Sequence, residues 1–126
     1  MYQSTREAST RQEKAIAKSL GAKRTPNSGA GKFSKGDLYI NNEWMIEAKT
    51  CMQPKSSFSI KKSWLDKMKE EQFATNKMYS SLCFDFGDEG QRYYVIDEQM
   101  FKTLVELLEN IEWNLYTNYN SKDIIL

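Results

Sequence analysis

The chain has 126 residues, of which 40% are hydrophobic and 13% aromatic; this composition excludes a disordered protein and is sufficient for one domain with its own core. The 18 basic and 17 acidic residues leave a net charge of +1, so the overall charge does not identify a partner. Histidine is absent, which excludes histidine bases, histidine nucleophile triads and histidine metal ligands.

The first predicted helix covers residues 10–21, TRQEKAIAKSLG, with Thr10 as its cap and Gly21 at its end. Three apolar residues recur on one side of this helix and are expected to face the core. They are Ile16, Ala17 and Leu20.

Glu13 lies on the same side of this helix, because it precedes Ile16 by three residues and Ala17 by four. A lone carboxylate is costly there unless it is paired or bound to a metal ion. Two interpretations remain open. Glu13 either bonds back to the Thr10 amide as part of a capping box, or it takes part in a metal site.

Residues 22–36 are expected to form a basic loop rich in glycine and serine. From Lys14 to Lys35 the chain has six lysines and arginines and no acid, which suits a polyanion, although a solvated surface has the same composition. The stretch SGAGKFSKGD contains the Gly-Lys pair of a nucleotide-binding P-loop. That pattern requires glycine in place of Pro26 and serine or threonine in place of Phe33, so no nucleotide cofactor is expected.

Residues 37–40 and 43–50 predict two strands joined at an Asn-Asn turn. Glu47 and Lys49 are two residues apart, so their side chains leave the same face of the strand. The alternate residues form an apolar face, which consists of Trp44, Ile46 and Ala48.

The register of this hairpin decides whether Asp37 shares a face with Glu47. A two-residue turn would send Asp37 to the other side. A three-residue connection, residues 41–43, pairs Ile40 with Trp44 and Asp37 with Glu47, and it also keeps the apolar residues together. We therefore predict the three-residue connection. The polar face then consists of Asp37, Tyr39, Met45, Glu47 and Lys49.

Two carboxylates and a lysine on one face are sufficient for phosphodiester hydrolysis without histidine. Carboxylate oxygens suit hard cations such as Mg²⁺ or Mn²⁺, and a divalent ion polarises a phosphodiester and lowers the pKa of a bound water. A lysine beside the metal orients or deprotonates that water. The alternative is an exposed strand face on which Glu47 and Lys49 form a salt bridge.

The remaining elements complete an α-β-β-α-β-β-α order, which predicts a single α/β (α+β) domain over residues 1–126. The tail, residues 110–126, is expected at an edge or at a dimer interface. The elements are a helix at 59–77, strands at 78–86 and 91–97, and a helix at 98–110. Their expected inward residues are Ile60, Trp64, Leu65, Met68 and Phe73, then Phe101, Leu104, Val105 and Leu108.

The second helix also carries polar residues for which we prefer ordinary structural roles. The run from Lys69 to Glu71 is expected to be a solvated face, and Gln72 is a candidate for supporting the site from behind. Cys51 and Cys83 are too few and too distant for a zinc cluster, and we interpret both as reduced. No apolar signal core or membrane-spanning run is present, so a cytoplasmic location without a membrane partner is expected.

The dipeptide GD at Asp37, followed ten residues later by EAK beginning at Glu47, resembles the motif of the PD-(D/E)xK nuclease superfamily, with Gly36 in place of the proline. The stretch KRTPNSGAGKFSKGD looks like the Arg-x-Pro-x-Ser-Gly loop before the metal-binding aspartate of Holliday junction resolvases of the archaeal type and their phage relatives. The helix SIKKSWLDKMKEEQ is also similar to the phage members. The resemblance covers about residues 5–90.

This resemblance implies a restriction-endonuclease-like core, with a central mixed sheet flanked by helices, and a homodimer that acts on DNA with Mg²⁺, for which Mn²⁺ can substitute. It also implies a glutamate on the first helix, which we assign to Glu13, with Glu7 as the alternative. The implied site consists of Asp37, Glu47 and the Ala48 carbonyl as metal ligands and Lys49 as the catalytic lysine.

Under the same resemblance, the basic loop holds nucleic-acid phosphate; the alternative is a flexible surface loop. Lysine and arginine side chains supply charge, and small polar residues with glycine amides allow close approach of the backbone. The expected DNA contacts are Arg24, Asn27, Ser28, Lys32 and Lys35, with Lys61 and Lys62 as further candidates that are otherwise a solvated helix face.

The sequence therefore favours a metal-dependent endonuclease of branched or structured DNA, a Holliday junction resolvase acting in DNA recombination and repair. If the protein is of phage origin, it is expected in the cytoplasm of a bacterial host. The alternatives are a nuclease of another DNA substrate, such as a nicking or end-processing enzyme, and a non-catalytic nucleic-acid-binding module on the same fold.

Overall fold

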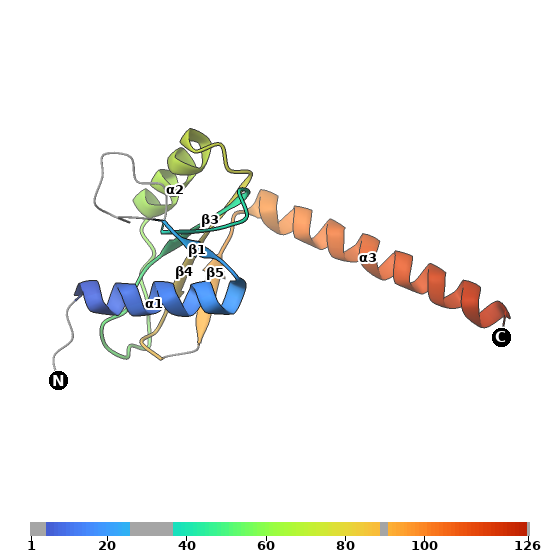
Figure 1. Ribbon diagram of the computed structural model, residues 1–126, viewed down its shortest axis with the longest axis horizontal. Helices are drawn as coiled ribbons and strands as arrows, with labels where there is room; N and C mark the ends of the chain where they lie inside the picture. Colours follow the sequence, from blue (N-terminus) through green and yellow to red (C-terminus); the bar gives the residue numbers. More distant parts are fainter. Residues whose placement is uncertain (1–4, 26–36, 89–90, 126) are drawn as a thin grey trace. The chain divides into compact units, whose positions relative to one another are not determined.

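The computed structural model describes residues 5–25, 37–88 and 91–125, which form an α+β protein with a five-stranded mixed sheet and three helices (Figure 1). The chain divides into two compact units, Met1–Val95 and Ile96–Leu126. The first unit contains the sheet and two helices, and the second contains the third helix. Both cysteines are free, as predicted.

The sheet has the strand order β1-β2-β3-β4-β5, and its neighbours are antiparallel except for β3 and β4, which are parallel. Parallel neighbours need a crossover connection, and α2 (Lys62–Ala74) supplies it. The short β1 lies where the sequence predicts a loop, because a two-residue strand has no periodicity to detect. The strands are β1 (Lys23–Arg24), β2 (Leu38–Ile40), β3 (Trp44–Ala48), β4 (Tyr79–Asp85) and β5 (Arg92–Val95).

The helix α1 (Thr5–Leu20) covers one face of the sheet. Ile16 is fully buried against Leu38, Ile46 and Cys83. This cluster confirms the predicted apolar face of β3, and it shows that the first helix packs on that face. The side chains that complete it are Ala17, Ala22, Ile40, Trp44 and Ala48.

The two ends of α1 differ in how well the sequence predicts them. Gly21 ends the helix as predicted, with a left-handed φ of 67° that glycine adopts without strain. The helix begins at Thr5, however, so Thr10 lies inside it and cannot be its cap. The capping-box interpretation of Glu13 is therefore wrong. Leu20, expected in the apolar stripe, is exposed.

The helix α2 packs on the face of the sheet opposite to α1. Alternate residues of a strand point to opposite faces, so Met45 faces α2 while Ile46 faces α1. Met68 of α2 contacts Met45 and Leu82, both of which are fully buried. The face predicted to be polar is therefore partly a packing face, and the prediction was wrong for Met45. The side chains around this second cluster are Trp64, Leu65, Phe84 and Val95.

Two residues expected to face inward from this helix are exposed. Ile60 precedes the first helical residue, and Phe73 is 89% exposed. At about 100° per residue, Phe73 is turned by about 140° from Met68 and leaves the buried side. The helix is shorter at both ends than the predicted 59–77.

The helix α3 (Glu98–Ile125) continues far beyond its predicted end at residue 110, so the tail is part of this helix. Phe101 and Leu108, which the sequence predicts to be buried, are exposed in the single chain. Among the helices described, none combines the length and apolar character needed to cross a membrane.

Candidate functional site

The hairpin of β2 and β3 has the three-residue connection that the sequence predicts. Asn41 adopts a left-handed φ of 54°, which asparagine tolerates better than most residues. Extended by one pair beyond β2, the register sets Asp37 opposite Glu47. The observed partners are Leu38 with Ile46, Tyr39 with Met45, and Ile40 with Trp44.

Asp37 is held at the beginning of β2 by both its backbone and its side chain. Its amide donates to the Ile46 carbonyl (3.1 Å), and its carbonyl accepts from the Thr25 amide (2.9 Å). Its Oδ2 accepts from the Ala48 amide at 2.8 Å, in the role that a strand carbonyl would otherwise have. The carboxylate is therefore part of the hairpin as well as a candidate metal ligand.

Glu47 is a carboxyl group in an unfavourable environment. Burial, together with the nearby charges of Asp37 and Glu71, raises its pKa to about 8. Lys49 and Lys67 act in the opposite direction. The Oε2 atom of Glu47 is buried and has no hydrogen-bond partner among the residues described. Such an oxygen is stabilised by a proton or a cation.

Lys49 directly follows β3 and remains hydrogen-bonded to its neighbours. Its amide donates to the Cys83 carbonyl (2.8 Å), and its carbonyl accepts from Gln12 Nε2 (2.9 Å). Its Nζ lies 4.5 Å from the centre of the Trp64 ring, within range of a cation–π interaction. Its charge lowers the pKa of Glu47, which links the lysine electrostatically to the carboxylates.

Glu13 is buried on α1 and belongs to the same electrostatic group. Burial raises its pKa, as does the charge of Asp37, whereas a hydrogen bond and the charge of Arg24 lower it. The Nε atom of Arg24 lies 3.3 Å from Glu13 Oε1. Glu7, the alternative helix glutamate, is exposed. The effect of the Asp37 charge on its pKa places Glu13 near Asp37.

Glu71 is a buried carboxylate that the sequence interpretation missed. We expected it on a solvated face, but it is only 9% exposed. Its Oε1 lies 3.8 Å from Lys67 Nζ, neither of its carboxylate oxygens has a hydrogen-bond partner among the described residues, and its charge raises the pKa of Glu47. Its position three residues after Met68, on the apolar side of α2, was the available signal.

The residues predicted to contact DNA differ in their surroundings. Arg24 lies in β1, paired with Glu13, so it is not the free loop cation that we expected. Lys61 and Lys62 are exposed, and Lys62 forms an ion pair with Asp66 (2.9 Å). The other predicted contacts, Asn27, Ser28, Lys32 and Lys35, lie outside the described residues.

Gln72 stabilises the packing of α2 on the sheet. Its Oε1 accepts from the Ser80 hydroxyl, and its Nε2 donates to the Met78 carbonyl (2.8 Å). These bonds connect the end of α2 to the beginning of β4. They give Gln72 a structural role, and none of them reaches the carboxylates.

The oxygen donors fit a hard cation in chemistry but not as a preformed cage. Among the residues described, no three histidine, cysteine, aspartate or glutamate side chains converge to hold a metal ion. The buried Oε2 of Glu47, without a hydrogen bond, is the atom that a Mg²⁺ ion would most directly satisfy. Asp37 lies across the hairpin from it.

No protein-family model, curated protein or solved structure matches this chain.

Proposed function

We propose that the protein is a metal-dependent endodeoxyribonuclease of branched or structured DNA, a Holliday junction resolvase. The observation that carries this proposal is the electrostatic linkage of four residues from three segments. Asp37 raises the pKa values of both Glu13 and Glu47, and Lys49 lowers that of Glu47. The resemblance of the motif to PD-(D/E)xK nucleases names the same four residues.

Asp37, Glu47 and the Ala48 carbonyl would hold the metal ion, with Glu13 beside them. Mg²⁺, or Mn²⁺ in its place, would supply a Lewis acid for the phosphodiester and lower the pKa of a bound water. Glu47 must lose its proton to act as a ligand, so metal binding near neutral pH should release a proton.

Lys49 would act on the phosphodiester through its charge. A cation beside the carboxylates offsets the negative charge that develops on phosphate oxygens during hydrolysis. The ring of Trp64 limits where the ammonium group can lie, which helps to hold the charge in one place. We expect the enzyme to work as a homodimer, since a four-way junction presents two equivalent strands to cut.

The decisive experiment is cleavage of a synthetic four-way junction and of plasmid DNA in Mg²⁺, Mn²⁺ or EDTA. Lys49→Ala should lower the single-turnover rate by roughly 100-fold or more without weakening binding in Ca²⁺. Lys55→Ala removes an exposed lysine from the segment after β3 and is the matched control. Cleavage by Lys49→Ala at the parent rate would refute the proposed mechanism. Plasmid cleavage with an intact junction would favour a nicking or end-processing nuclease.

A non-catalytic nucleic-acid-binding module is the second candidate. It is favoured by the absence of a converging three-carboxylate group among the described residues and by the use of the Asp37 carboxylate in the hairpin. This module would bind DNA equally well in EDTA and in Mg²⁺ and would cleave none of the substrates. A titration of metal binding by calorimetry, with proton release measured in two buffers, separates the two candidates without an activity assay.

A further inference from the structure

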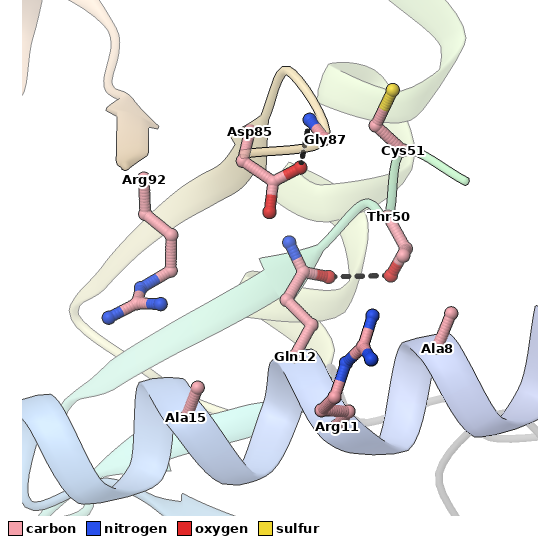
Figure 2. A pocket seen from close by; sticks show the side chains of 9 residues that line it. All are labelled: Ala8, Arg11, Gln12, Ala15, Thr50, Cys51, Asp85, Gly87 and Arg92. Atoms are coloured by element: carbon pink, nitrogen blue, oxygen red, sulfur yellow. Dashed lines mark hydrogen bonds between the residues drawn. The ribbon is translucent and has the colours of Figure 1, made fainter. Parts of the chain in front are cut away.

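A cavity of about 310 Å³ lies between α1 and the ends of β3 and β4 (Figure 2), and Glu47 is not among its lining residues. The two strands are parallel, so their carboxyl ends meet at one edge of the sheet. Ligands of open sheets with helices commonly bind outside such ends. The volume is at the lower limit of about 300–1,000 Å³ for small-ligand sites, which suits one small group and not a length of duplex.

The walls of the cavity are held in place by hydrogen bonds. Gln12 donates from Nε2 to the Lys49 carbonyl (2.9 Å), and its Oε1 accepts from the Thr50 hydroxyl (2.6 Å). On the opposite side, the Gly87 amide donates to Asp85 Oδ1 at 2.9 Å. These contacts fix polar groups before any ligand arrives, which lowers the entropy lost on binding.

Gly87 has a second role in shaping this cavity. Its φ is 89°, and a Cβ there would lie 2.7 Å from the Gln53 carbonyl oxygen and from the backbone of Pro54. The Lys55 amide also donates to the Phe86 carbonyl (2.9 Å), so the segment after β3 is tied to the end of β4. The rim is therefore a closely packed backbone.

Two arginines from different elements face this cavity. Figure 2 shows the Arg11 guanidinium extending from α1 toward the strands and the Arg92 guanidinium extending from β5 toward the helix, on either side of Gln12. Each guanidinium has five donors in a planar fork that matches phosphate oxygens, so a partner on one edge leaves another edge for a ligand. The Asp85 carboxylate also lines the cavity.

The charges of the lining residues indicate the class of anion. Two arginines and one aspartate leave one net positive charge among the lining side chains. A phosphodiester carries one negative charge, whereas a terminal phosphate approaches two near neutral pH. The aspartate disfavours the dianion more than the monoanion.

We propose that this cavity binds one phosphodiester group of a nucleic-acid strand between Arg11 and Arg92. The choice of a nucleic acid as the source rests on the proposed function, whereas the recognition of a phosphoryl group does not. Gln12 connects the cavity to the main chain of Lys49 and is adjacent to Glu13 in sequence. A strand anchored here is thereby linked through Gln12 to the residue that follows β3, and none of the four candidate-site side chains lines the cavity.

The test measures binding of labelled single-stranded and duplex DNA in EDTA, where cleavage does not occur. Arg11→Gln and Arg92→Gln should each weaken binding by roughly 10-fold and reduce the slope of log affinity against log salt by about one. Because both arginines hold the same phosphate, the double variant should lose less than the product of the two effects. Arg6→Gln, on the same helix but outside the cavity lining, should change affinity less than 2-fold.

Two further arms identify the source of the phosphoryl group. Inorganic phosphate and a nucleoside monophosphate are titrated by NMR into the parent protein and the double variant. Arginine-dependent binding of these small anions, with DNA affinity unchanged in the variants, would assign the cavity to a free ligand and overturn the nucleic-acid source. No arginine-dependent response to DNA or to either small anion would overturn the site itself. An equal loss in Arg6→Gln would assign the effect to the general charge of α1.

Separate controls test whether the variants fold and whether the arginine geometry matters. Arg92→Lys keeps the charge but not the fork, so it should retain part of the affinity, and equal melting temperatures confirm that the variants are folded. If DNA binding depends on both arginines but the protein cleaves no DNA, the phosphate site is supported and the nuclease proposal is refuted. If the protein cleaves DNA and the double variant binds DNA with unchanged affinity, the nuclease proposal is supported and the phosphate site is refuted.

Discussion

Asp37 shows how one side chain can serve both the hairpin and the candidate site. Its carboxylate accepts the Ala48 amide, a bond that the asparagine amide oxygen can also accept but that alanine cannot. Asp37 was found from its spacing to Glu47 and Lys49, which period-two alternation makes visible in a sequence. Its bond to Ala48 was not visible, because it depends on a local departure from the strand ladder.

We predict that Asp37→Ala lowers the free energy of unfolding by about 1–3 kcal/mol, whereas Asp37→Asn changes it by less than about 1 kcal/mol. Both substitutions should abolish cleavage. Urea unfolding in EDTA measures the first effect, with Asp66→Ala, which removes an exposed ion pair, as the control. Equal stability of the alanine and asparagine variants would show that the hydrogen bond to Ala48 does not stabilise the hairpin.

Glu47 predicts a pH dependence of the stability of the metal-free protein. Its pKa is raised from 4.5 to about 8, so between these values the folded state binds more protons than the unfolded state. The stability that this group contributes is therefore full below about pH 4.5 and is lost as the pH rises to about 8. Each tenfold change in proton affinity corresponds to about 1.4 kcal/mol.

Glu47→Gln should remove this dependence and raise stability at pH 8.5 more than at pH 5.5. Thermal unfolding in EDTA at the two pH values is the measurement. Glu43→Gln, in the exposed turn of the same hairpin, is the matched control and should behave like the parent. The burial of this carboxyl group would be contradicted if the parent protein gained stability from pH 5.5 to 8.5 and Glu47→Gln showed the same pH dependence.

At the scale of elements, the register of the β2–β3 hairpin was predictable, whereas the two helices of the first unit were predictable only in part. The hairpin combines strict alternation with a turn of known preferences, so register and face follow together. The apolar residues of α2 allowed more than one helical face, and the selection among them depends on the sheet. Glu71 and Phe73 were therefore assigned to the wrong sides.

The burial of Met68 and the exposure of Phe73 predict that alanine substitutions at these two positions of α2 differ widely in their effect on stability. Met68→Ala should cost about 2–5 kcal/mol, because it leaves a cavity between the helix and the sheet. Phe73→Ala should change stability by less than about 0.5 kcal/mol, because the ring is exposed. Chemical denaturation of the two variants compares them directly. A costly Phe73→Ala and a tolerated Met68→Ala would reverse the assignment of the helix faces.

At the scale of the whole molecule, the second unit is a single long helix with its own pattern. Apolar residues recur along α3 at alternating intervals of three and four, the spacing of a coiled-coil seam. Most of them are exposed in the single chain. The seam consists of Phe101, Leu104, Leu108, Ile111 and Leu115.

If the protein forms the homodimer proposed above, this seam is the part of the chain best suited to join the two copies. Leu108→Glu should then convert a dimer to a monomer in sedimentation experiments and leave the melting temperature of the monomer close to that of the parent at low concentration. Glu106→Gln, outside the seam on the same helix, is the control. A parent protein that sediments as a monomer at all concentrations would exclude this role.

The topology of the mixed sheet also indicates the order in which its strand pairs form during folding. The hairpin of β2 and β3 closes through three residues, whereas the pairing of β3 with β4 must wait for the whole crossover through α2. Local contacts form earlier during folding than contacts between distant segments. We therefore expect the nascent chain to bring Asp37 and Glu47 together while both are still hydrated, and Glu47 to lose its water when α2 docks on the sheet. A metal ion present during folding would meet the two carboxylates before that docking, so cations should accelerate the late phase of folding as well as stabilise its product.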